Sequence, residues 1–210
     1  MIAEKIDTST YLSSLISGMR GYCTDFALSL AQEMPVIDLY EGLFRPTLYQ
    51  VGELWEYNRI SVATEHLATS ITESIMNQLY HRIISPQRVN KRVVVTCVEG
   101  EQHQVGAKMV ADVFEMHGWD SYFLGANTPT SELIRFIREV KPQLVALSLS
   151  IYFHLPELKH VLNILNENFP NLNIMIGGQA FNHVGNIAQE LHSQANYFSD
   201  LKELDTFLKS

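Results

Sequence analysis

The sequence lacks the features that mark disulfide-rich, metal-cluster and membrane proteins. Among its 210 residues there are only two cysteines, Cys23 and Cys97, which lie far apart in apolar surroundings. We expect both to be reduced, buried thiols rather than a disulfide or a metal-binding pair. No apolar run approaches the ~18 residues that a membrane span requires, and no signal-peptide pattern opens the chain. We therefore expect a cytoplasmic protein.

Basic residues are also scarce. The 15 Lys and Arg are outnumbered by 23 Asp and Glu, which gives a formal net charge of −8, and no basic run is longer than Lys91-Arg92. An acidic surface repels phosphate backbones, so direct binding to nucleic acid is not expected. No P-loop, nucleophile-base pair or pair of catalytic carboxylates is found, and we expect no independent enzyme activity.

Residues 8–84 have helical periodicity throughout and no convincing strand. Apolar residues recur every three or four positions in four stretches, of which the third is predicted to kink at Pro46. The segment Gly52–Arg59 is predicted to break the pattern, and Ser61 is the predicted N-cap of the fourth helix. Short connections between four helices predict a four-helix bundle over residues 1–84.

A polar segment at residues 85–90 predicts a linker, and strands alternate with helices from residue 91 onward. The predicted strands are 92–98, 120–124, 144–150, 173–176 and 196–198, and the predicted helices are 105–117, 130–140, 156–168, 184–192 and 201–208. This alternation predicts an α/β domain over residues 91–210, with a doubly wound parallel sheet of five strands in a flavodoxin-like arrangement.

A polar loop follows the first predicted strand and holds Glu101 and His103, just before a helix that begins near Gly106. Ligands of open parallel sheets lie at the carboxyl ends of the strands, where Ser148 and Gly177-Gly178 are also expected. Imidazole is a good ligand for a transition metal, and a carboxylate two residues away can fix its tautomer. The pattern therefore predicts a cofactor site at this edge.

This arrangement resembles the cobalamin-binding domain family, whose signature is an acidic residue, x, His, x, x, Gly, then Ser-x-Leu, then Gly-Gly. The resemblance implies that His103 replaces the benzimidazole of the vitamin as the lower axial ligand of cobalt. It also implies that the displaced nucleotide tail runs between the sheet and the helices, beside Gly106, Ser148 and Gly177-Gly178. The stretches Gly118-Trp119 and 124–127 are similar to the second strand and following loop of the family.

Two residues depart from the signature. Ser150 stands where the family commonly has Leu, which affects packing around the tail. Glu101 stands where Asp is usual, and a Glu at this position is more similar to the light-sensing branch of the family than to its methyl-carrying branch.

The helical segment carries a second resemblance. Trp55 is followed, after nine residues, by Glu65-His66, a pattern similar to the helical cap of adenosylcobalamin-dependent photoreceptor regulators. The resemblance implies that Trp55 packs beside the adenosyl group and that Glu65 and His66 line its pocket. Without this resemblance, we would interpret Trp55 and His66 as core residues. Glu65 would be a favourable charge in the first turn of its helix. Glu56 replaces a His that binds cobalt after illumination in some of those regulators.

Three functions remain open at this point. The leading hypothesis is a cobalamin-binding sensor, responsive to light through adenosylcobalamin. Because no DNA-binding domain precedes the bundle, its output is expected to pass through a protein partner or self-association. The main alternative is a corrinoid methyl carrier of a methyltransferase system, and the third is a haem- or bilin-binding tetrapyrrole sensor. The other six histidines are interpreted as surface or structural residues, and His183 is expected to border the tail.

Overall fold

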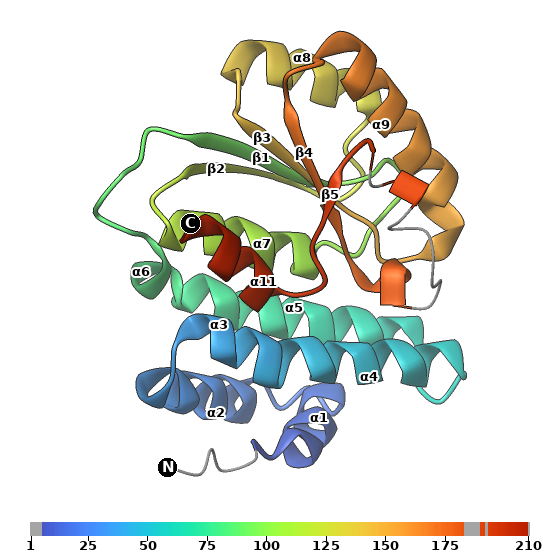
Figure 1. Ribbon diagram of the computed structural model, residues 1–210. Helices are drawn as coiled ribbons and strands as arrows, with labels where there is room; N and C mark the ends of the chain where they lie inside the picture. Colours follow the sequence, from blue (N-terminus) through green and yellow to red (C-terminus); the bar gives the residue numbers. More distant parts are fainter. Residues whose placement is uncertain (1–5, 183–189, 192, 210) are drawn as a thin grey trace. The chain divides into compact units, whose positions relative to one another are not determined.

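The computed structural model describes residues 6–182, 190–191 and 193–209 (Figure 1). The chain divides into two compact units, a helical unit (Met1–Ile83) and a sheet unit (Ile84–Ser210). Within these described ranges, no helix is long and apolar enough to cross a membrane. The prediction of a helical N-terminal region followed by a parallel sheet is confirmed.

In the helical unit, α1 packs against α2, α4 and α5, and α5 also packs against α2 and α4. Large aromatic side chains that are fully buried, Tyr11, Tyr40 and Phe44, fill its interior. The predicted cap of α5 is confirmed, because the Ser61 hydroxyl accepts a hydrogen bond from the Thr64 N–H at 3.1 Å. The elements are α1 (Thr8–Ile16), α2 (Arg20–Glu33), α3 (Val36–Leu39), the π-helical turn η1 (Tyr40–Phe44), α4 (Arg45–Glu56), α5 (Val62–Gln78) and α6 (Tyr80–Ile83).

Two local predictions for this unit are corrected. The third helix is interrupted by the wide turn η1 ahead of Pro46, which itself lies in the first turn of α4, where a missing N–H is tolerated. The predicted break at Gly52–Arg59 is too early, since α4 continues to Glu56. The helix ends where Asn58 takes a left-handed conformation with φ of 55° and its N–H bonds to the Trp55 carbonyl.

The sheet unit contains five parallel strands in the order β2-β1-β3-β4-β5, which confirms the predicted flavodoxin-like sheet. The strands are β1 (Arg92–Cys97), β2 (Asp120–Gly125), β3 (Leu144–Ser148), β4 (Asn173–Gly177) and β5 (Asn196–Tyr197). The helices are α7 (Val105–Met116), α8 (Thr130–Val140), α9 (Leu155–Asn168) and α11 (Leu201–Leu208), with short 3-10 turns at η2 (Tyr152–His154) and η3 (Gln179–Asn182). The predicted helix 184–192, apart from residues 190–191, and His183 lie outside the described residues.

Helices cover both faces of this sheet, with α8 and α9 on one face and α7 and α11 on the other (Figure 1). Val94 and Val145 belong to the core formed with α8 and α9. Their neighbours Val93 and Val95 are equally buried and point to the opposite face, because side chains alternate along a strand. Burial on both sides explains the continuous apolar run that predicted β1.

The segment 85–90, predicted as a linker, is hydrogen bonded to the sheet unit. The Ser85 N–H bonds to the Glu115 carbonyl and the Val89 N–H to the Gly118 carbonyl. The Arg88 guanidinium forms ion pairs with Glu115 and Asp120, each at 2.8 Å. This segment is therefore an ordered first part of the sheet unit.

Candidate functional site

The loops that follow β1, β3 and β4 converge at one edge of the sheet. Cys97 at the end of β1 pairs with Ser148 at the end of β3, which pairs with Gly177 at the end of β4. β1 and β3 are neighbours in the sheet, but the chain continues from β1 to β2 on one side and from β3 to β4 on the other. Ligands of such sheets bind where the connections diverge in this way. Glu101 and His103 lie in the loop after β1, and the structure therefore gathers the predicted sheet-unit residues at this edge.

Glu101 is fully buried and accepts hydrogen bonds at both carboxylate oxygens. Its Oε1 accepts the His103 N–H at 2.9 Å, and its Oε2 accepts the N–H groups of Ser150 and Ile151 at 3.0 and 2.9 Å. Burial alone raises the pKa of this carboxyl, but the hydrogen bonds from His103 and Ile151 outweigh burial and hold the pKa at about 2. Glu101 is therefore an ionised group that can only accept. The N–H groups of Ser150 and Ile151 bind Glu101 instead of a neighbouring strand. β3 therefore ends at Ser148 and not at Ser150 as predicted.

The buried carboxylate fixes the tautomer of His103. The Nδ1 atom of His103 lies 2.6 Å from Glu101 Oε1. Since the carboxylate can only accept, Nδ1 carries the proton and Nε2 keeps its lone pair. The His103 side chain is 40% exposed, so this pair of residues presents an oriented nitrogen ligand at the open edge of the sheet.

Neighbouring residues hold this loop in place. The Asn127 side chain accepts the Gly100 N–H at 2.8 Å, and the Asn127 N–H bonds to the Glu101 carbonyl at 2.8 Å. The Gln104 side chain accepts the Ala126 N–H at 3.1 Å. Cys97, buried and free as predicted, has its thiol 3.6 Å from the His103 carbonyl, and burial raises its pKa to about 12. Hydrogen bonds thus hold the loops after β1 and β2 together.

Two family models, both described as a B12 binding domain, match the chain, one over residues 91–190 and the other over residues 9–80. The chain belongs to the B12-binding domain family. The prediction that the chain is a cobalamin-binding protein is confirmed at the level of the family. Cobalamin or a related corrinoid is the cofactor class that these matches support.

Relatives of two kinds are similar to this chain. It is 29% identical to the HTH-type transcriptional repressor CarA of Myxococcus xanthus over 64% of the chain and 45% of that repressor, and 24% identical to CarH of the same organism over 81% and 58%. It is also 26% identical to trimethylamine corrinoid protein 1 of Methanosarcina acetivorans over 64% of the chain and 68% of that protein. The chain therefore spans about half the length of the two repressors.

A solved structure has the same fold. The monomethylamine corrinoid protein of Methanosarcina barkeri superposes with a TM-score of 0.79 over 95% of both chains, at 14% sequence identity. This likeness extends through both the helical and the sheet regions, and it supports the fold of the B12-binding family member.

The glycines at this edge of the sheet differ in what a side chain at each position would meet. Gly178 has φ of +120°, and a Cβ there would lie 2.2 Å from the Leu149 carbonyl oxygen. A Cβ on Gly177 would lie 3.1 Å from the Phe198 carbonyl oxygen, whereas one on Gly106 would meet nothing within 4 Å. The chain's own backbone therefore requires Gly178, which the sequence pattern had associated with a bound nucleotide tail. Of these three glycines, Gly106 is the one where a Cβ would have open space.

Alanine substitutions should separate these two kinds of glycine. Gly178→Ala combines a strained φ with a backbone clash, and we expect a loss of about 4 kcal/mol in the free energy of unfolding. Gly106→Ala adds a methyl group into open space near the start of α7, so stability should stay unchanged or rise by up to about 1 kcal/mol. Urea unfolding of the two variants measures the difference, and equal destabilisation would contradict this assignment.

The other predicted site residues, Trp55, Glu65 and His66, all lie in the helical unit. His66 Nδ1 lies 2.6 Å from Glu65 Oε2, and the Thr69 hydroxyl donates to Glu65 Oε1 at 2.9 Å. Both residues lie in the first two turns of α5, with the His66 side chain 73% exposed. Trp55 lies in the last turn of α4 and is 38% exposed. His66 is thus not a buried core histidine.

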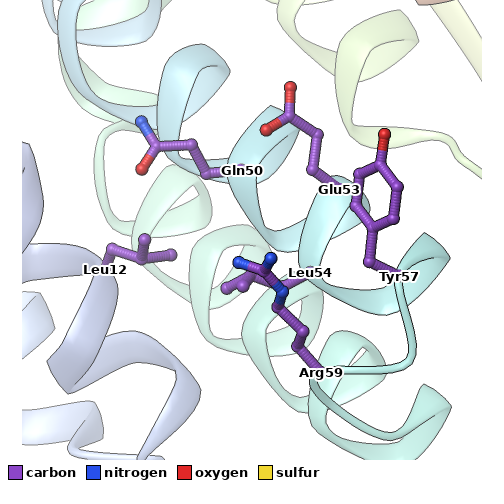
Figure 2. Close-up of a pocket in the computed structure, with 6 residues that line it drawn as sticks. All are labelled: Leu12, Gln50, Glu53, Leu54, Tyr57 and Arg59. Atoms are coloured by element: carbon purple, nitrogen blue, oxygen red, sulfur yellow. The ribbon is translucent and has the colours of Figure 1, made fainter.

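A hollow of about 220 Å³ in the helical unit is lined by Leu12 from α1, by Gln50, Glu53 and Leu54 from α4, and by Tyr57 and Arg59 from the turn that follows (Figure 2). It is smaller than the usual small-molecule pocket of ~300–1,000 Å³. None of Trp55, Glu65 and His66 lines it, so we do not assign it to the cofactor.

Sequence patterns missed three kinds of contributor to the site. The N–H groups of Ser150 and Ile151 bind Glu101 through the backbone, which carries no residue-type signal. Asn127 adopts φ of 50°, and the Gly125-Ala126-Asn127 turn was its only sequence signal. His154, interpreted as a surface or structural residue, lies with its Nδ1 3.5 Å from Glu101 Oε2.

Proposed function

We propose that this B12-binding protein is a cobalamin sensor that responds to light and signals through protein-protein contacts. The observation that carries the cobalamin assignment is the buried Glu101 carboxylate, which holds Nδ1 of His103 so that Nε2 would be the nitrogen that binds cobalt. The light response rests on the Trp55-x9-Glu65-His66 pattern and on Glu101 in place of Asp, both of which resemble the photoreceptor regulators.

The residues of the sheet edge fit the lower side of cobalamin. His103 Nε2 would serve as the lower axial nitrogen ligand, which suits cobalt as it suits other transition metals. Gly106 borders open space for the nucleotide tail. Ser148 ends β3 at this edge, and its hydroxyl has no hydrogen-bond partner within the described part of the chain, so it is available to the tail. Gly177 and Gly178 shape the neighbouring turn.

The helical unit would serve the upper side. When bound, adenosylcobalamin supplies a cobalt-carbon bond that visible light breaks. Trp55 would pack against the upper group, and the Glu65-His66 pair, already hydrogen bonded at 2.6 Å, would line its pocket. Loss of that group would remove packing from Trp55 and shift the helical unit between two states, which a partner protein or a second copy could read. With Glu56 beside Trp55, His66 or water would take the vacated position.

The second candidate is a methyl carrier in a methyltransferase system. It is favoured by the similarity to trimethylamine corrinoid protein 1. A methyl carrier must open the upper face of its cofactor to partner enzymes, and a Trp held over that face would obstruct them. Retention of adenosylcobalamin in the dark would support the sensor, whereas acceptance of a methyl group from a corrinoid methyltransferase would support the carrier.

Illumination tests the sensor directly. The protein is incubated with adenosylcobalamin in the dark, freed of excess cofactor, and measured by visible absorption and size-exclusion chromatography before and after green light. We expect bound cofactor in the dark, a changed spectrum after light, and a changed association state. A Trp55→Ala variant should bind but change its association state less. Unchanged absorbance and unchanged association in the wild type would reject the light response.

A further inference from the structure

We propose that His154 is a second histidine of the site, which positions Glu101 and, through it, the ligand nitrogen of His103. This inference deepens the proposed function and rests on His103 being the cobalamin ligand. Its starting point is that one buried carboxylate faces two imidazoles. His103 Nδ1 lies 2.6 Å from Oε1, and His154 Nδ1 lies 3.5 Å from Oε2.

The Nδ1 atom of His154 makes no other polar contact within the described residues. It is buried and has no hydrogen-bond partner within the described residues, although the whole side chain is 20% exposed. A buried polar atom without a partner is costly, and an oxygen of the ionised Glu101 carboxylate lies 3.5 Å away. A lone pair on Nδ1 would face that negative charge and be repelled, so the proton belongs on Nδ1. A small movement from 3.5 Å completes the hydrogen bond to Oε2.

The surrounding backbone holds His154 at this point. It ends the short turn η2, three residues beyond Ile151, whose N–H binds Oε2 together with that of Ser150. On the other side its ring packs over Gly100, where a Cβ would lie 3.5 Å from Cδ2 and Nε2 of His154. Gly100 has φ of +86°, which favours glycine, and its N–H is bound by Asn127. The ring therefore lies between the loops after β1 and β3.

This placement gives His154 a defined role. With three donors on Oε2, the carboxylate plane is fixed and Oε1 stays directed at His103 Nδ1. Without His154, the carboxylate can rotate, and the basicity and orientation of His103 Nε2 change. His154 does not itself contact the cofactor in this proposal, and it is a positioning residue.

The first test uses the protein without cobalamin, so that it does not depend on the proposed function. Long-range ¹H–¹⁵N spectra of the imidazoles report which ring nitrogen carries the proton. We expect Nδ1–H tautomers for both His103 and His154. His154→Asn, which keeps a donor near the Nδ1 position, should leave the His103 signals in place, and His154→Leu should shift them. His160→Leu, on the exposed side of α9, is the matched control and should have no effect. A His154 protonated only at Nε2 would overturn the proposal.

The second test uses the protein loaded with adenosylcobalamin in the dark. His154→Leu should weaken binding in the His-ligated form by about 10-fold, the lower range for a residue that orients a metal ligand, and His154→Asn should restore most of it. Wild-type binding in both His154 variants, or equal losses in both, would overturn the donor role. A wild-type protein that binds no cobalamin would instead refute the proposed function, and the tautomer measurement would still decide the hydrogen bond.

Discussion

A His103→Ala variant is expected to lose the His-ligated spectrum of bound cobalamin and at least about 100-fold of its affinity, beyond the range for residues that only orient a ligand. The reason is that His103 lies at the carboxyl edge with its Nδ1 held by Glu101, which makes Nε2 the ring nitrogen that would bind cobalt. Any cofactor that still binds would do so through its tail contacts, with water or its own benzimidazole below the cobalt.

The same substitution should leave the fold intact, which makes the loss of ligation interpretable. The His103 side chain is 40% exposed, and its N–H, which also bonds to Glu101, remains in the alanine variant. Equilibrium dialysis and visible absorption measure binding, and thermal unfolding measures stability. His160→Ala, an exposed histidine on α9, is the control and should match the wild type. A His103→Ala protein with an unchanged spectrum would show that another group ligates cobalt.

The sheet unit could be predicted from the sequence because its signals are local and repeated. Val93–Val95 and Leu144–Leu147 are apolar runs of strand length, and each is followed by a helical pattern, which admits few topologies other than a parallel sheet. The topology then places the strand ends together, so Glu101 and Ser148 could be assigned to one edge. A contact between distant residues follows here from the order of elements, and not from the residues themselves.

The details of the site could not be predicted because they depend on backbone groups and on turns. Nothing in the identities of Ser150 and Ile151 says that their N–H groups will bind a carboxylate. The Gly-Gly pair was associated with a bound tail, and the sequence does not show that the Leu149 carbonyl of the same chain also excludes a side chain at Gly178. His154 had no partner at ligand spacing in the sequence. Its contact with Glu101 exists only after η2 folds back over Gly100.

Glu101→Gln is the second substitution from which we expect a large effect, because a carboxamide has one acceptor where the site needs two. If the amide NH₂ faces Ser150 and Ile151, it opposes two N–H donors. If it faces His103 instead, it opposes the backbone N–H and Nδ1–H of that residue. The first orientation loses two buried hydrogen bonds, and the second loses the bond from the His103 backbone N–H and forces His103 to change its tautomer. We expect the free energy of unfolding to fall by about 3 kcal/mol, and Tm by roughly 10 °C.

The variant should also weaken cobalamin binding, and the two effects have a common origin. With NH₂ toward His103, Nδ1 must accept, the proton moves to Nε2, and the nitrogen that would bind cobalt has no lone pair. With NH₂ toward the loop after β3, His103 keeps its tautomer but loses a charged acceptor. In either orientation we expect cobalamin binding to weaken by about 10-fold to 100-fold. Glu99→Gln is the matched control, because Glu99 accepts a single exposed N–H, from Thr130 at 3.0 Å. Equal behaviour of the two variants in denaturant and in dialysis would mean that burial of the Glu101 carboxylate has no part in holding His103.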